Sequence, residues 1–162
     1  SLLGTQVFFL DPTIKADPAL SWNLSDRIFF THGACHVLAG VFLNTVEADG
    51  LKARWIKPVG GQAGNHIFVT NGVWAFDARR FSAVHRLIDH FSRGWRSRYS
   101  DWLAEVVDID FDLLNTEALN RRGMRGPEQY LLDPIPRAEK FIAKKFKIDN
   151  PITQLHSPSP FC

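Results

Sequence analysis

The sequence predicts an α+β protein in which helices pack against a small antiparallel β-sheet. Apolar residues recur with a helical period over residues 34–45, and two apolar runs flank the turn-forming pair Asn71-Gly72. Further helical periods follow over 81–91 and 136–146. The order is therefore helix, strands, helix, strand and helices, which is typical of an antiparallel sheet packed against helices.

The composition is that of one globular domain. The chain has 162 residues, of which 45% are apolar and 12% aromatic, enough to build a buried core. We expect a single domain over residues 1–150 and a flexible tail over 151–162, where proline and serine accumulate. The formal net charge is only +2, so the overall charge favours neither nucleic acid nor a membrane surface as a partner.

The chain shows no sign of export or membrane insertion. Its apolar runs are far shorter than the roughly 18 residues of a membrane-spanning helix. Residues 1–10 lack the basic segment and cleavage site of a signal peptide, so we expect a cytoplasmic protein, with secretion by a non-classical route left open. Two cysteines are too few for a disulfide framework, which favours a free Cys35 over a pairing with Cys162.

Before the first long helix the pattern is irregular. Residues 6–10 predict a short strand, and a loop rich in proline and polar residues continues to Asp26. The apolar run 27–31 fits either a strand or an extended approach to the helix. The helix over 34–45 ends before Gly50, and a strand is predicted over 53–56.

The pair Asn71-Gly72 marks a β-hairpin. Type I′ turns need positive φ at both central residues, which Asn and Gly adopt most easily. A two-residue loop pairs Thr70 with Val73 across the two strands. The later elements are a helix over 81–91, with Ser82 as its cap and Gly94 as its stop, a strand over 106–112, and helices over 116–122, 127–132 and 136–146.

Counted outward from this turn, His66 pairs with Asp77. Residues that are directly opposite in an antiparallel pair share a face, with Cβ atoms roughly 5 Å apart. This register predicts a hydrogen bond between the imidazole and the carboxylate. A three-residue loop would instead place Asp77 on the opposite face.

A cysteine stands where the first long helix begins. Thiols react as thiolates, and the positive end of a helix dipole favours an anion at Cys35. A nearby imidazole would accept the thiol proton. The backbone N–H of Cys35 is a candidate for an oxyanion hole, and Asn23 and Gln6 are the side-chain candidates.

The order of Cys35 at a helix start, His66 on a strand and Asp77 on the neighbouring strand resembles the papain-like and transglutaminase-like cysteine enzymes. The resemblance covers residues 26–80 and implies a papain-like arrangement of an active-site helix on an antiparallel sheet. It also implies that Cys35 is the nucleophile, His66 the general base and Asp77 the residue that orients it. The chain departs from the papain signature, since His36 replaces the tryptophan that follows the cysteine.

The expected function is that of a thiol-dependent hydrolase or acyl-transfer enzyme. Peptidases, glutamine deamidases and transglutaminases share this chemistry, which acts on a protein or peptide-like amide through a Cys-His-Asp triad and needs no cofactor.

Other interpretations of the same residues stay open. Cys35 would be an ordinary buried thiol if Asp77 only capped the following helix. A metal site at Cys35, His32, His36 and His66 lacks the ligand pattern of known zinc sites. An alternative function is a non-catalytic domain that binds protein or nucleic acid through a basic segment, which consists of Arg79, Arg80, Arg93, Arg96 and Arg98.

Overall fold

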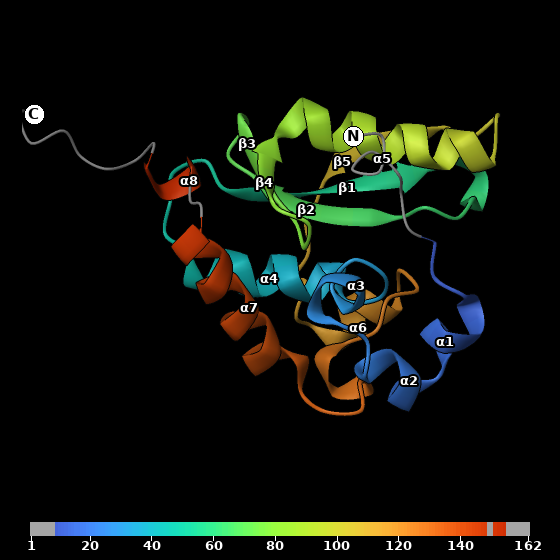
Figure 1. Cartoon of the computed structure of the whole chain (residues 1–162), viewed down its shortest axis with the longest axis horizontal. Coiled ribbons are helices and arrows are strands. Elements are labelled where there is room, and N and C mark those ends of the chain that lie inside the picture. The colour runs from blue at the N-terminus through green and yellow to red at the C-terminus, as the bar shows by residue number, and fades with distance from the viewer. Residues whose placement is uncertain (1–8, 149–150, 155–162) are drawn as a thin grey trace, which may run out of the picture.

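The computed structural model describes residues 9–148 and 151–154. The strands are β1 (Lys52–Pro58), β2 (His66–Thr70), β3 (Trp74–Phe76), β4 (Phe81–Ala83) and β5 (Ala104–Asp108). They form an antiparallel sheet in the order β4-β3-β2-β1-β5. The longer helices are α4 (Cys35–Thr45), α5 (Val84–Arg98) and α7 (Pro134–Ile148). Figure 1 shows α5 on one side of the sheet and α4 and α7 on the other. The α+β prediction is confirmed.

The central strand β2 is buried along its whole length because helices cover both faces of the sheet. Ile67 and Val69 belong to the core that contains α4, whereas Phe68 belongs to a second core that contains α5. Phe42 of α4 stacks on Phe76 of β3 with ring centroids 4.6 Å apart. Alternate residues of β2 thus serve different cores, as the period of a strand requires.

The segment before α4 is helical, contrary to the loop expected up to Asp26. It contains α1 (Pro12–Ala16), α2 (Pro18–Trp22) and α3 (Asp26–Phe29). Each of the first two begins with a proline after an aspartate that caps the free backbone N–H groups. Because α3 includes residues 26–29, the run at 27–31 is not a strand. The strand expected over 6–10 lies mostly outside the described residues.

In the β2–β3 hairpin four residues separate the last paired residues, Thr70 and Ala75, so the predicted two-residue turn is wrong. Thr70 pairs with Ala75 rather than Val73. Among the described residues only glycines have positive φ, which excludes the type I′ geometry at Asn71. Asn71 Oδ1 instead accepts hydrogen bonds from the backbone N–H groups of Val73 and Trp74, at 3.0 and 2.8 Å.

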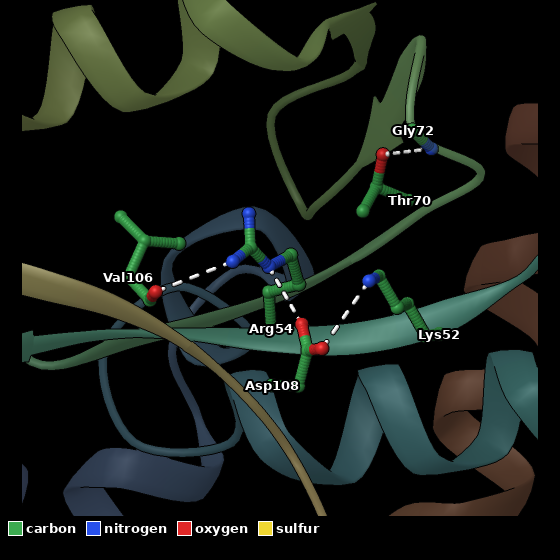
Figure 2. Close-up of polar contacts among 6 residues, drawn as sticks. All are labelled: Lys52, Arg54, Thr70, Gly72, Val106 and Asp108. Carbon is green, nitrogen blue, oxygen red and sulfur yellow. Dashed lines mark hydrogen bonds and ion pairs between the residues drawn. The ribbon is translucent and has the colours of Figure 1, made fainter.

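This larger loop moves the register by two residues, which returns every side chain to its predicted face. Thr70 Oγ1 also accepts a hydrogen bond from Gly72 N at 2.9 Å, visible in Figure 2, and fixes the start of the loop. His66 and Asp77 therefore still share a face, although they are no longer directly opposite.

Helix α5 begins at Val84, later than predicted. Residues 81–83 form β4 instead, where Phe81 pairs with Phe76 and buries its ring against Phe42. Ser82 does not cap the helix, because the N-cap is Ala83. Helix α5 also continues through Gly94, which is buried. Tertiary pairing and packing here outweigh the local preferences of serine and glycine.

The edge strand β5 ends at Asp108, short of the predicted 112. Asp108 accepts hydrogen bonds from Arg54 Nε at 2.9 Å and from Lys52 Nζ at 3.3 Å. Arg54 Nη2 also donates to the Val106 carbonyl at 3.2 Å, as Figure 2 shows. These contacts join β5 to β1, and the two ion pairs of the exposed Asp108 add little stability because water and salt screen them.

The C-terminal third consists of shorter helical segments followed by α7. They are α6 (Thr116–Asn120) and a 3₁₀ turn at Pro127–Gln129, each shorter than predicted. A further helix, α8 (Pro151–Gln154), buries Ile152 completely, so the core extends past the domain boundary expected at residue 150. No helix within residues 9–148 or 151–154 has the length and apolar character needed to cross a membrane.

Candidate active site

Cys35 is the first residue of α4. The N-cap residue Ala34 gives no side-chain hydrogen bond, and the first-turn N–H groups of a helix have no partner within it. Just before it, Gly33 adopts φ 142°, a conformation that favours glycine. The Tyr130 hydroxyl donates to the Gly33 carbonyl at 2.5 Å and fixes this turn. The Cys35 thiol is free and half-buried, at the boundary between the core and a cleft.

His66 and Asp77 form a buried hydrogen-bonded pair. His66 Nε2 donates to Asp77 Oδ2 at 2.9 Å, and the residues are 1% and 7% exposed. Asp77 Oδ1 accepts the backbone N–H groups of Arg79 and Arg80 at 3.0 and 3.4 Å. The His66 ring stacks on Phe91 of α5 with centroids 4.8 Å apart. The imidazole is therefore fixed in both orientation and tautomer.

The second ring nitrogen of His66, Nδ1, is available to interact with the Cys35 thiol. His66 Nδ1 is buried and makes no hydrogen bond to the described residues. The Cys35 thiol nevertheless lies close enough for hydrogen-bond attraction and charge to act between the two side chains. A small movement of the sulfur would complete a Cys35–His66–Asp77 series of contacts.

The charged forms of Cys35, His66 and Asp77 stabilise one another. Burial lowers the pKa of His66, but Asp77 and Cys35 outweigh it and raise that pKa to about 9. Burial likewise raises the pKa of the Cys35 thiol, yet the neighbouring imidazoles of His36 and His66 hold it well below its ordinary value. Burial also opposes ionisation of Asp77, whose pKa is lowered by His66. Both shifts favour a thiolate beside an imidazolium.

A second imidazole, that of His36, also acts on the thiol. His36 is 4% exposed, and its Nε2 donates to the Arg125 carbonyl at 2.6 Å. The Tyr130 hydroxyl lies 3.4 Å from the same nitrogen. Burial and then the charge of Cys35 raise the pKa of Tyr130, which keeps its hydroxyl a proton donor to Gly33.

These supporting residues escaped prediction from the sequence. In the sequence, His36 stands out only as a possible metal ligand and as a departure from the papain signature. Arg125 and Tyr130 lie 89 and 94 residues further along the chain. A motif with a local spacing cannot reveal contacts over such separations.

The three residues open onto a cleft of about 920 Å³. Part of its wall is aromatic and consists of Trp55, Phe91, Trp95 and Tyr99. The Trp95 and Tyr99 rings stack with centroids 6.0 Å apart. Asn65 precedes His66 and accepts a hydrogen bond from Trp55 Nε1 at 3.0 Å, which joins this wall to the start of β2. The cleft is large enough to enclose a substrate of peptide size.

Other predicted site residues lie elsewhere. The Asn23 side chain donates to the Ala19 carbonyl at 2.9 Å in its own helix and does not line the cleft. Gln6 lies outside the described residues. Of the basic segment, only Arg79 and Arg98 line the cleft. The described part of the chain contains no cluster of three or more His, Cys, Asp or Glu side chains placed to hold a metal ion.

Comparisons of the chain with family models, curated proteins and solved structures found no match. Its function therefore has to be inferred from the chemistry of the site.

Proposed function

We propose that this chain is a thiol-dependent hydrolase or acyl-transfer enzyme that acts on amides, with Cys35 as nucleophile. The observation that carries the proposal is the half-buried thiol at a helix start beside a buried imidazole, whose far nitrogen donates to Asp77 at 2.9 Å. A thiol with a depressed pKa, a base in reach and a carboxylate that orients the base are the parts of a nucleophilic triad.

The similarity to papain-like and transglutaminase-like enzymes supports the same proposal. In those enzymes the cysteine begins a helix that packs on an antiparallel sheet, and the sheet supplies the histidine and the acid. Here α4 packs against β2, which supplies His66, and Asp77 directly follows β3. We propose that the arrangement of these elements is papain-like and that Cys35, His66 and Asp77 have the roles of nucleophile, general base and orienting acid.

The reaction proceeds in two halves. Cys35 Sγ attacks the amide carbonyl carbon, and the C–S bond forms while the carbonyl oxygen takes up the negative charge. His66 then gives the proton on Nδ1 to the leaving nitrogen, the C–N bond breaks, and a thioester remains. Water that has lost a proton to His66 attacks the thioester, so the C–S bond breaks and a carboxylic acid leaves. An amine in place of water gives a new amide.

The backbone N–H of Cys35 is the donor best placed to stabilise the oxyanion. It belongs to the first turn of α4, where N–H groups have no helical acceptor. The hydrogen bond from Tyr130 to the Gly33 carbonyl holds the preceding peptide in place. Tyr130 thus acts as a positioning residue.

The direct test is alkylation of Cys35 by iodoacetamide, in which the thiolate displaces iodide. A Cys162→Ser background makes Cys35 the only thiol in the chain. We expect fast labelling at pH 7 and a loss of about tenfold in His66→Ala, because an ordinary thiol is only a few per cent ionised at that pH. His85 is exposed on α5 and does not line the cleft, so His85→Ala is the matched control. Slow labelling that is equal in all three proteins would refute the proposal.

A further inference from the structure

We propose that the substrate of this site carries an anionic group, a carboxylate or a phosphate, close to the carbonyl that Cys35 attacks. This inference rests on the proposed function and specifies its substrate class. It follows from the charges of the cleft, which are almost all of one sign.

Six cationic side chains line the cleft. They are Lys15, Arg27, Arg79, Arg98, Arg122 and Arg125. Among the described residues of the lining, Asp77 carries the only carboxylate, and its oxygens already bind His66 and the amides of the following turn. Within the same part of the chain none of the six cations forms an ion pair with a carboxylate. The cleft therefore has a positive charge that residues 9–148 and 151–154 do not neutralise.

Two of these cations lie on the His66 side of the site. Arg79 is two residues beyond Asp77 and half-buried. Burial lowers its pKa, the charge of Asp77 opposes this shift, and the positive charges of Arg80 and then Arg27 lower the pKa further. The guanidinium groups of Arg79 and Arg27 are therefore near enough to repel each other. Like charges kept together without a counter-ion are typical of an anion site, since the ligand supplies the missing charge.

Two more cations, Lys15 and Arg125, lie near the turn that leads into Cys35. A Cβ placed on Gly33 would lie 3.9 Å from Lys15 Cε. Arg125 Nη2 donates to the Lys15 carbonyl at 3.4 Å, which links the two segments. The pKa of His32 falls to about 4 through burial and then the charge of Lys15, so His32 is neutral at pH 7.

The aromatic wall restricts the rest of the substrate. Trp55, Phe91, Trp95 and Tyr99 offer apolar faces next to the cations. An amide with an anionic group on one side of its carbonyl and an apolar group on the other would match both surfaces. Arginine guanidiniums bind carboxylate and phosphate through paired hydrogen bonds, so both sources of the anion fit.

Two alkylating agents of nearly equal size test the charge preference. Iodoacetate is an anion and iodoacetamide is neutral, and both modify the same sulfur. The ratio of their rates on Cys35, divided by the ratio for N-acetylcysteine, measures the preference for an anion. In the Cys162→Ser background we expect this quotient to be about 10 at low salt. It should fall toward 1 as added salt screens the charges.

Matched variants separate the arginines from the imidazolium, which also attracts anions. We expect the double variant Arg27→Gln, Arg79→Gln to lower the quotient several-fold while labelling by iodoacetamide stays fast. Arg86 is exposed on α5 outside the cleft, and Arg86→Gln should leave the quotient unchanged. Lys15→Gln removes an exposed cation and gives a second test if the double variant does not fold.

The outcomes for the two proposals are distinguishable. A quotient that none of these variants changes, with fast labelling that depends on His66, would overturn the anion inference alone. Slow labelling that is the same with and without His66 would instead overturn the proposal that Cys35 is an activated nucleophile, whatever the value of the quotient.

Protection experiments identify the source of the anion. Inorganic phosphate and succinate would each be tested as protectants of Cys35 against iodoacetamide, with sodium chloride matching the ionic strength. Protection by phosphate that is lost in the Arg27, Arg79 double variant supports a phosphate-bearing substrate. The same result with succinate supports a carboxylate. Protection by neither compound counts against the inference.

Discussion

His66 Nε2 donates a hydrogen bond to Asp77 Oδ2 at 2.9 Å, although the two residues are not opposite each other in the β2–β3 ladder. The observed register, extended by one pair, places Asp77 opposite Phe68. The bond is therefore diagonal, and Asp77 reaches it from a turn that its own Oδ1 helps to close. The structural and the proposed catalytic roles of this carboxylate use different oxygens.

This division makes Asp77→Asn an informative variant. An amide oxygen can still accept the Arg79 and Arg80 N–H groups, so we expect the turn to persist. The charge that raises the pKa of His66 is lost, and we expect that pKa to fall clearly below about 9. NMR titration of the imidazole measures it directly, and alkylation of Cys35 at pH 7 should slow by about tenfold.

Asp110→Asn provides the control for this variant. Asp110 is exposed and lies outside the cleft, so the His66 titration and the alkylation rate should match those of the unchanged protein. An unaltered His66 titration in Asp77→Asn would show that the carboxylate does not set the charge of the imidazole.

The pH dependence of alkylation follows from the two shifted pKa values. The lowered pKa of Cys35 means that the thiolate is lost only as the pH falls well below the ordinary value. The raised pKa of His66 means that the imidazolium persists until the pH rises through about 9. We therefore expect a reactive plateau between these limits, measured as the iodoacetamide rate from pH 4 to 10. In His66→Ala the rate should instead rise with a midpoint closer to that of an ordinary thiol, near 8.5.

The shifted pKa values of His66 and Cys35 also make the free energy of unfolding depend on pH. His66 has a raised pKa in the folded protein, so its contribution is fully present below about pH 6.5 and is lost as the pH rises through about 9. The lowered pKa of Cys35 has the opposite sign, so its contribution is present at high pH and is lost in acid. If the unfolding free energy of the unchanged protein fell no more steeply between pH 6.5 and 9 than that of His66→Ala, this assignment for the histidine would be contradicted.

Local patterns were sufficient to predict much of the fold. Helix α4 and the two strands of the hairpin follow directly from the period of their apolar residues. The shared face of His66 and Asp77 was also predicted, but from a loop of the wrong length. The prediction of a shared face is nevertheless correct, because the observed register differs from the predicted one by two residues and such a shift preserves every face. The longer loop is stabilised by hydrogen bonds to the Asn71 side chain.

Long-range contacts were beyond the sequence. The cations that line the cleft come from segments as distant as Lys15 and Arg125, and nothing in their local surroundings indicates a common cavity. The hydrogen bond from His36 to the Arg125 carbonyl likewise spans 89 residues. Such contacts depend on the tertiary packing of segments that lie far apart in the sequence, which no periodicity reveals.

Tyr130→Phe tests the support of the turn before Cys35. The change leaves the Gly33 carbonyl without its hydroxyl donor, and we expect a loss of about 1 kcal/mol in the free energy of unfolding. Because the turn positions the thiol, alkylation should also slow. Urea denaturation and iodoacetamide kinetics measure the two effects. Tyr99 is exposed, so Tyr99→Phe should change neither, and equal behaviour of the two variants would rule out a positioning role for Tyr130.

The glycine-rich connection before His66 offers a matched pair of substitutions. Gly64 has φ +110°, and a Cβ there would lie 2.8 Å from Trp102 Nε1 and 2.9 Å from the Trp95 ring. Gly60 has φ +71°, and a Cβ there would meet nothing within 4 Å. Both alanine variants carry backbone strain, of about 1 kcal/mol, but only Gly64→Ala adds a clash between rigid rings.

We therefore expect Gly60→Ala to lower the free energy of unfolding by about 1 kcal/mol and Gly64→Ala by about 3 kcal/mol. The clash lies two residues before His66, beside Trp102, which donates to the Ala63 carbonyl at 2.8 Å. Gly64→Ala should thus also displace the imidazole and slow alkylation of Cys35, whereas Gly60→Ala should not. Equal losses of stability with unchanged alkylation in both variants would mean that the two tryptophans yield freely and do not hold the start of β2 in place.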